Sequence, residues 1–231
     1  MKLVMLPGMD GTGELFHAFA NALDNRFETL IVEYPTDQLL SYAELEGVVT
    51  PRLPQHEPYT LIGESFSGPI AISIAAKRPR NLHAFILCST FCRNPRPELG
   101  FLSKFVTAIP IQSLPISIIG RFLLGRHTTS ERISSLKAVL RRVDAKVLRQ
   151  RLQLILTVDV SDKLRSVRIP SIYFRGTEDL LIPKGAVALI HKNLPSLSVV
   201  CFEAPHFLLQ TVPIEASSAL VEFLDKTENA L

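Results

Sequence analysis

The sequence predicts a single α/β domain built on a predominantly parallel sheet of six strands. The chain has 231 residues, of which 47% are hydrophobic and 20% charged. That length suits one α/β domain with a full core. Short apolar runs alternate with amphipathic stretches, which is typical of βαβ units around a buried parallel sheet. The expected strands are residues 2–6, 29–33, 59–62, 84–88, 171–175 and 198–202.

Helix signals fill the intervals between these runs. Apolar residues at helical spacing predict the first helix, at Leu15, Phe16, Phe19 and Leu23. Ser41 and Glu44 form a capping-box pattern, which predicts that a second helix begins there. Residues 67–77 are rich in Ala, Ile and Ser, so we expect a helix packed closely against the sheet. Two prolines, Pro183 and Pro213, are placed to open the last two helices.

Residues 93–168 break this alternation and predict an inserted helical cap. Prolines at positions 95, 97, 110 and 115 are followed by Arg-rich stretches in which Leu and Ile recur every three or four residues. The segment holds 15 Lys and Arg against 5 Asp and Glu, a net charge of +10, whereas the rest of the chain has −7. We therefore expect a core formed by residues 1–92 and 169–231, carrying a basic cap.

A serine stands at the junction of a predicted strand and a predicted helix, in the stretch GESFSG at residues 63–68. A nucleophilic serine on a strained strand-to-helix turn needs small residues two positions away on each side. Gly63 meets this need, while Ser67 replaces the second glycine of GxSxG and Gly68 follows it. A serine that only caps the helix is the structural alternative. Ser65 is therefore the candidate nucleophile.

A glycine-rich turn, LPGMDGTG at residues 6–13, follows the first predicted strand. Together with the serine motif it resembles the α/β-hydrolases, whose loop at this place, often HGxxG, supplies one amide of an oxyanion hole. The resemblance implies that the N–H groups of Met9 and Phe66 form that hole, and Pro7 stands where the family often has His. A phosphate-binding loop is the alternative. However, the glycines read GxxGxG rather than GxGxxG, and no GK[ST] follows.

The same resemblance assigns the other two members of a catalytic triad. Residues 174–183, FRGTEDLLIP, resemble the family's acid loop, which implies Asp179 as the carboxylate and Glu178 as a second choice. Residues 202–207, FEAPHF, follow the last predicted strand, where the family places its histidine, and this selects His206. A solvated turn carboxylate and a structural histidine are the alternatives, but the order Ser, Asp, His favours the triad. The resemblance implies an α/β-hydrolase fold in a six-stranded version.

The chemistry that this resemblance implies is acyl transfer through an acyl-enzyme on Ser65, with His206 as base and Asp179 orienting it. No cofactor or metal is expected, because the sequence offers no cluster of Cys, His and carboxylates. Apolar positions in the cap favour an acyl or alkyl chain, so a carboxylic ester of short to medium acyl length is the first expected substrate. Candidate substrate contacts are Phe105, Ile109, Leu114 and Phe122.

Two other functions stay open. The basic side of the cap could dock an acidic carrier protein or an anionic surface, which would make the protein an esterase or thioesterase for acyl groups on a carrier or CoA. A solvated helix face is the simpler interpretation of these arginines. A noncatalytic binding protein is the third function, and the intact triad disfavours it. Nucleic-acid binding is not expected, since the basic stretch lacks interleaved aromatics. The arginines are Arg126, Arg132, Arg141, Arg142, Arg149 and Arg151.

The cysteines and the first residues predict a cytoplasmic protein. Cys88, Cys92 and Cys201 form no CxxC pair, which fits a reducing compartment. The first residues, MKLVMLPG, contain only a short apolar run before Pro7, too short for a signal peptide or a membrane span. The oligomeric state is not predicted.

Overall fold

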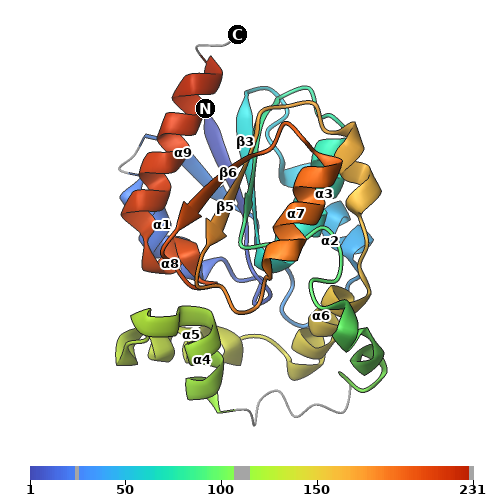
Figure 1. Ribbon diagram of the computed structural model, residues 1–231, viewed down its shortest axis with the longest axis vertical. Helices are drawn as coiled ribbons and strands as arrows, with labels where there is room; N and C mark the ends of the chain where they lie inside the picture. The colour runs from blue at the N-terminus through green and yellow to red at the C-terminus, as the bar shows by residue number, and fades with distance from the viewer. Residues whose placement is uncertain (24–25, 107–114, 229–231) are drawn as a thin grey trace.

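The computed structural model describes residues 1–23, 26–106 and 115–228, and its centre is a six-stranded sheet (Figure 1). The strand order is β2-β1-β3-β4-β5-β6, and every neighbouring pair is parallel. The predicted α/β fold and all six predicted strands are therefore confirmed. The strands are β1 (Lys2–Leu6), β2 (Glu28–Ile31), β3 (Tyr59–Glu64), β4 (Leu82–Cys88), β5 (Ser171–Gly176) and β6 (Ser198–Phe202).

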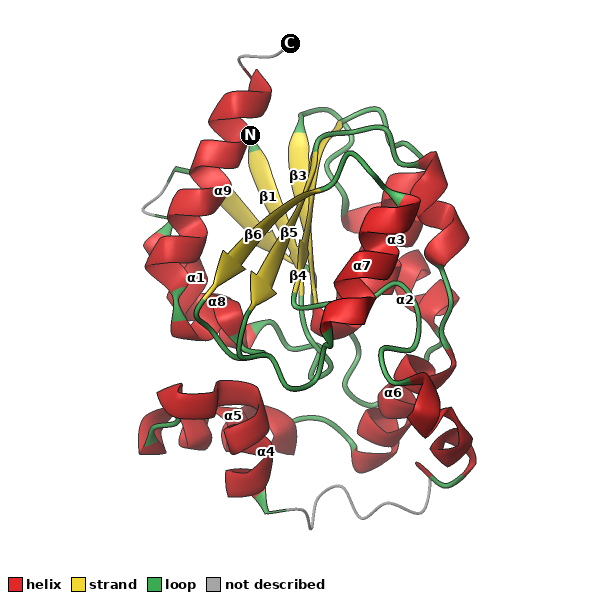
Figure 2. Ribbon diagram, in the orientation of Figure 1, coloured by secondary structure: helices red, strands yellow, loops and turns green. Residues whose placement is uncertain are grey.

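Helices cover both faces of this sheet, as Figure 2 shows. One face packs against α1 (His17–Ala22), α8 (Leu208–Thr211) and α9 (Pro213–Glu228), and the other against α2 (Tyr42–Val49), α3 (Gly68–Ala76) and α7 (Lys184–Asn193). Successive side chains of a strand point to opposite faces. In β1, accordingly, Leu3 and Met5 join the first layer, whereas Val4 and Leu6 join the second. Burial on both faces explains why the strands read as continuous apolar runs.

The helix starts follow the signals in the sequence. Ser41 and Glu44 form the full capping box: the Glu44 N–H donates to the Ser41 hydroxyl, and the Glu44 carboxylate accepts from the Ser41 N–H at 2.8 Å. Pro183 is the N-cap of α7, and Pro213 is the first residue of α9. Short 3-10 helices extend several elements: η1 (Glu14–Phe16), η2 (Thr50–Arg52) and η3 (Ser65–Ser67).

Residues 93–168, called the insert below, connect β4 to β5. The helices α4, α5 and α6 lie beyond the carboxyl ends of the strands (Figure 2), whereas η8 packs against α3, where Lys163 Nζ donates to Ser73 Oγ at 2.8 Å. The two ends of the insert meet, since Val160 N donates to Cys92 O at 2.8 Å. The division of the chain into a core of residues 1–92 and 169–231 and a separate cap of residues 93–168 stays a prediction. The helices are η4 (Pro97–Lys104), α4 (Ile116–Leu124), η7 (Gly125–His127), α5 (Ser130–Arg141), α6 (Ala145–Thr157) and η8 (Ser161–Ser166).

The six arginines predicted to share one solvated side of the insert do not do so. Arg151 is only 2% exposed, so the structure corrects that assignment. Arg126 pairs with Glu178 and Glu203 at 3.2 and 3.4 Å. Arg142 pairs with Glu14. Several arginines of the basic insert thus bind the acidic remainder of the chain. In the described ranges, no helix is long and apolar enough to cross a bilayer.

Candidate active site

The strand order places a topological switch point at the carboxyl ends of β1 and β3. From β1 the chain moves to β2 on one side and then returns to β3 on the other, so the connections leave in opposite directions. Ligands of open parallel sheets bind at such a switch point. The glycine loop (residues 7–13) follows β1 here, and Ser65 follows β3. The two motifs found 50 residues apart in the sequence therefore meet at one place.

Ser65 occupies a strained turn between β3 and α3. Its φ angle is 48°, in the left-handed region that non-glycine residues rarely adopt. A Cβ on Gly63 would come within 2.6 Å of the Ala71 Cβ, and one on Gly68 would overlap the Thr90 side chain. The turn thus requires glycine at 63 and 68 rather than at 67. This explains how Ser67 can replace the second glycine of the usual motif.

Ser67 also connects the serine turn to the glycine loop. Its hydroxyl donates to the carbonyl of Pro7, and a hydroxyl has only one hydrogen, so Tyr34 Oη must donate to Ser67 Oγ, at 2.6 Å. The two positions at which the sequence departs from the α/β-hydrolase pattern, Ser67 and Pro7, are therefore bonded to each other. Sequence reasoning missed Tyr34, which is 33 residues away from its partner.

The predicted triad residues form one chain of hydrogen bonds. Ser65 Oγ lies 2.8 Å from His206 Nε2, and His206 Nδ1 lies 2.9 Å from Asp179 Oδ2. The side chains of His206 and Asp179 are 4% and 3% exposed. The other Asp179 oxygen, Oδ1, accepts N–H bonds from Leu181 at 2.8 Å and Ile182 at 3.0 Å. Three hydrogen bonds shared between its two oxygens hold the carboxylate in one orientation.

The loops after β5 and β6 are joined beyond the ends of their strands. Thr177 N donates to Phe202 O at 2.8 Å, and Glu178 N donates to Ala204 O at 3.0 Å. Gly176 makes this approach possible, because a Cβ there would come within 2.6 Å of Pro205 O. Backbone contacts therefore set the separation between Asp179 and His206.

The surroundings of Asp179 and His206 favour the charged form of each side chain. Burial alone raises the pKa of Asp179, but the charge and hydrogen bond of His206 and the N–H groups of Ile182 and Leu181 outweigh it and lower that pKa below its ordinary value. Burial alone lowers the pKa of His206, but Asp179, and to a smaller degree Glu64, raise it above the ordinary value. Asp179 accepts the Nδ1 hydrogen, which leaves the Nε2 lone pair of a neutral His206 facing Ser65.

A buried carboxyl group next to the serine was not found by sequence reasoning. Burial raises the pKa of Glu64 to about 7, the charge of Asp10 adds to the rise, and the hydrogen bond from Gln210 opposes it. Gln210 Nε2 donates to Glu64 Oε1 at 2.9 Å. The charge of the Glu64 carboxylate in turn raises the pKa of His206.

The remaining predicted site residues have different outcomes. Met9 lies in the glycine loop and Phe66 directly follows Ser65, as an oxyanion role requires, but that role stays a prediction. Phe105 and Phe122 are 62% and 46% exposed, and Ile109 and Leu114 lie outside the described residues, so the substrate contacts also stay predictions. Within the described ranges, no three His, Cys, Asp or Glu side chains are placed to hold a metal.

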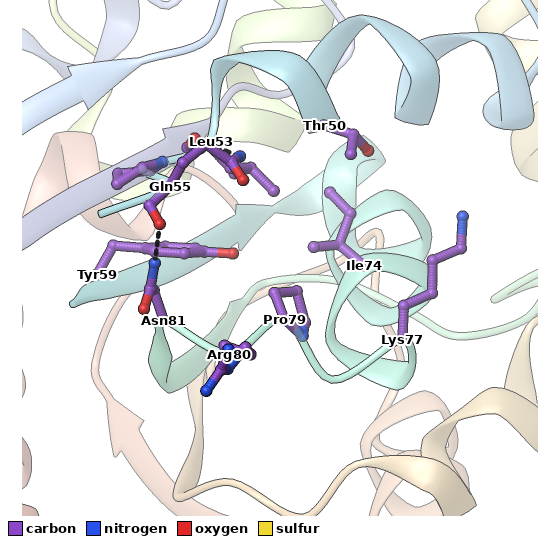
Figure 3. Close-up of a pocket in the computed structure, with 10 residues that line it drawn as sticks. Thr50, Leu53, Gln55, Tyr59, Ile74, Lys77, Pro79, Arg80 and Asn81 are labelled. Atoms are coloured by element: carbon purple, nitrogen blue, oxygen red, sulfur yellow. Dashed lines mark hydrogen bonds between the residues drawn. The ribbon is translucent and has the colours of Figure 1, made fainter. Parts of the chain in front are cut away.

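One cavity lies away from this site. Figure 3 shows its lining, which includes Tyr59, Lys77 and Asn81, and its volume is about 610 Å³. Tyr59 begins β3, whereas Ser65 follows its end, so the two are separated by roughly 20 Å of strand. This cavity is not the place where Ser65 would meet a substrate.

Comparison with known proteins agrees with the geometry. Residues 43–208 match the model of the family described as serine aminopeptidase, S33. The chain is 29% identical over 225 residues to a pimeloyl-[acyl-carrier protein] methyl ester esterase from Aeromonas hydrophila, covering 88% of this chain and 87% of that protein.

Solved structures support the same fold. An esterase from Exiguobacterium antarcticum has a TM-score of 0.83 at 17% identity, covering 97% of this chain and 92% of its own. An enol-lactonase from Burkholderia xenovorans LB400 has a TM-score of 0.81 at 16% identity, covering 96% and 90%. The family match spans more than half of the chain and includes Ser65, Asp179 and His206. The chain therefore belongs to the serine aminopeptidase S33 family and is a hydrolase of the α/β-hydrolase fold.

Proposed function

We propose that this protein is a serine esterase that hydrolyses carboxylic esters through an acyl-enzyme on Ser65. One observation carries the proposal: a strained-turn serine at the head of a continuous hydrogen-bond chain through His206 to a buried Asp179. This arrangement is the one that lets a weak hydroxyl nucleophile lose its proton as it attacks. The esterase among its relatives supports the same activity.

The first step forms the acyl-enzyme. Ser65 Oγ attacks the ester carbonyl carbon while His206 Nε2 takes the hydroxyl proton, and Asp179 stabilises the resulting imidazolium. The carbonyl oxygen becomes an oxyanion, for which the N–H groups of Met9 and Phe66 are the proposed donors. The tetrahedral intermediate then collapses, and the alcohol leaves with the proton from His206. One lost oxyanion donor typically costs about 3 kcal/mol of transition-state stabilisation.

The second step frees the enzyme. His206 takes a proton from water, the hydroxide attacks the acyl carbonyl, and Ser65 Oγ leaves and recovers the proton. The products are a carboxylic acid and the alcohol released in the first step. No metal or cofactor is needed in either step.

The proposed substrate has a short to medium acyl chain, as the apolar residues of the insert indicate. An acyl group on an acidic carrier protein is the second candidate. The acyl-carrier-protein esterase from Aeromonas hydrophila favours it, and so do the exposed cations of the insert, such as Arg121, Lys137 and Arg141. Arg126 and Arg142 are less suitable for docking, because they already pair with Glu178 and Glu14. The cytoplasm is the proposed compartment, in keeping with three free thiols.

The test compares wild type with Ser65→Ala on p-nitrophenyl esters of increasing acyl length. Ser217→Ala is the matched control, since it removes a buried hydroxyl from α9, away from the site. We expect wild type and the control to turn over these esters and Ser65→Ala to lose all measurable turnover. Equal turnover by Ser65→Ala and wild type would overturn the proposal. No turnover by any of the three proteins would point to a carrier-bound substrate or to a binding role.

The same preparation separates the two substrates. A methyl ester carried on an acyl carrier protein is assayed beside the free methyl ester at low and high ionic strength. If the basic surface docks the carrier, kcat/KM for the carried ester falls as salt rises, while that for the free ester stays constant. Equal salt dependence would assign the protein to small-molecule esters.

A further inference from the structure

Arg151 is a buried cation beside the candidate oxyanion hole. It lies on α6 of the insert, and its side chain is among the largest fully buried ones in the described chain, at 2% exposure. Removing a guanidinium from water is costly unless its N–H groups are paired. We therefore expect the buried guanidinium of Arg151 to have a specific role at this position.

Among the residues that the structure describes, the hydrogen bonds of the Arg151 side chain go to backbone carbonyls. Nη1 donates to Met9 O at 2.9 Å and to Asp10 O at 2.8 Å, and Nη2 donates to Pro35 O at 2.8 Å. No salt bridge to Arg151 occurs in the part of the chain that the structure describes. The guanidinium is therefore bound by the backbone of the glycine loop rather than neutralised by a paired carboxylate.

The surroundings of the guanidinium are shaped to it. Its Cζ lies 5.7 Å from the ring centre of Tyr34 and 5.9 Å from that of Phe66, which is cation–π range. On the loop side, Gly11 has a φ angle of 74°, and a Cβ there would come within 2.6 Å of Nη1. Two aromatic rings and one bare glycine backbone thus enclose the fork of Arg151.

We propose that Arg151 is a positioning residue for the oxyanion hole, an inference that rests on the proposed esterase function. The glycine loop contains Gly8, Gly11 and Gly13, and such a loop has many accessible conformations. Arg151 fixes the directions of two successive carbonyls, Met9 and Asp10, and so fixes the peptide planes next to the Met9 N–H. The same guanidinium touches Phe66, whose N–H is the other proposed donor.

Only arginine has the geometry for this role. Its planar fork can reach three carbonyls at once, whereas a lysine ammonium is a compact point charge on a flexible stem. The fixed positive charge is bonded to the Met9 carbonyl, beside the proposed oxyanion hole, and preorganised charge of this kind favours the transition state. The insert therefore contributes to the chemistry as well as to substrate choice.

The test uses Arg151→Ala and Arg151→Lys, with Leu154→Ala as the control on the same helix. Leu154 packs against the core cluster of α2 and α3 and has no hydrogen bond to the glycine loop. We expect Arg151→Ala to lower kcat about tenfold or more with KM changed less than about twofold, because the loss falls on the transition state. Arg151→Lys should recover part of kcat, and millimolar guanidinium should partly rescue Arg151→Ala only. Leu154→Ala should lose thermal stability and keep kcat.

Hydrogen exchange of the Gly11 amide gives a readout that needs no turnover. This amide donates to Gly8 O at 3.1 Å within the loop. We expect its exchange to be faster in Arg151→Ala than in wild type or Leu154→Ala. Unchanged exchange overturns the inference even if the esterase proposal stands. Absence of Ser65-dependent turnover in wild type, with faster exchange in Arg151→Ala, overturns the esterase proposal and the catalytic part of the inference. If Arg151→Ala does not fold, Arg151→Lys is the deciding variant. The inference is overturned if Arg151→Lys has the same kcat and the same Gly11 amide exchange as the wild type.

Discussion

The carboxyl edge of the sheet and the insert are built in opposite ways. At the edge, the side chains of His206 and Asp179 are 4% and 3% exposed, and hydrogen bonds hold both of them. On the insert, large apolar side chains face solvent: Phe101 is 67% exposed and Phe105 62%. Chemistry requires groups fixed to within a fraction of an ångström, whereas substrate choice can be changed by exchanging surface residues. We infer that the buried edge carries out the reaction, supported by Arg151 of the insert, whereas the exposed apolar side chains of the insert are the candidates for substrate choice.

The largest expected effect comes from the buried edge. Asp179→Asn keeps the size of the side chain but can present an amide N–H to His206 Nδ1, which favours the wrong imidazole tautomer. The analogous change in serine proteases lowers kcat about 10⁴-fold, and we expect a similar loss here. Steady-state kinetics on a p-nitrophenyl ester measure it. Glu178→Gln, one residue earlier and on the loop surface, is the control and should keep most of the activity. A loss of less than about tenfold in Asp179→Asn would remove Asp179 from the triad.

A smaller effect is expected where the two loops of the edge join. Ser67→Ala leaves Pro7 O and Tyr34 Oη without their partner in a site where residue 67 is 0% exposed. We expect the free energy of unfolding to fall by about 1–3 kcal/mol. Tyr34→Phe keeps the Ser67–Pro7 bond and should cost about 1 kcal/mol. Urea unfolding compares the two variants. An equal loss in both would mean that the bond to Pro7 contributes little.

The pH dependence of kcat/KM tests the charge environment of the edge. Only neutral His206 can accept the Ser65 proton, so activity falls as pH drops through the His206 pKa, which Asp179 and Glu64 raise. Glu64→Gln removes one of these two charges, and its amide can still bond to Gln210. The acidic limb of the profile should therefore move to lower pH in the variant. A limb that stays in place would show that Glu64 has no charge effect on His206 over the pH range of the limb.

Sequence reasoning located the strands and selected the three side chains that the structure joins by hydrogen bonds, because both follow local rules. Buried parallel strands are apolar runs, and Ser65, Asp179 and His206 each follow the end of one, in a fixed order. The Tyr34–Ser67–Pro7 link could not be predicted in this way, since it joins residues 33 and 60 positions apart through tertiary packing.

Arg151 is a different case, because a usable signal was present. Charge alone groups it with the solvated arginines of the insert. Yet it follows Val147 and Leu148 at helical spacing, and both of these residues are buried on α6. A charged residue within the apolar stripe of a helix indicates a buried charge whose N–H groups are satisfied by hydrogen bonds inside the protein. The apolar stripe of α6 therefore distinguishes Arg151 from the solvated arginines of the insert.

The smallest expected effect lies on the insert and tests the other half of the comparison. Phe122 is 46% exposed, so Phe122→Ala should change the free energy of unfolding by less than about 0.5 kcal/mol. Phe91, which is 1% exposed, is the matched control, and Phe91→Ala should cost about 3–5 kcal/mol. If Phe122 contacts the acyl chain, its loss should raise KM for longer p-nitrophenyl esters while leaving the acetate unchanged. A uniform fall in kcat for every chain length would contradict the proposed role of Phe122 in substrate choice, because the side chain would then act on the chemistry.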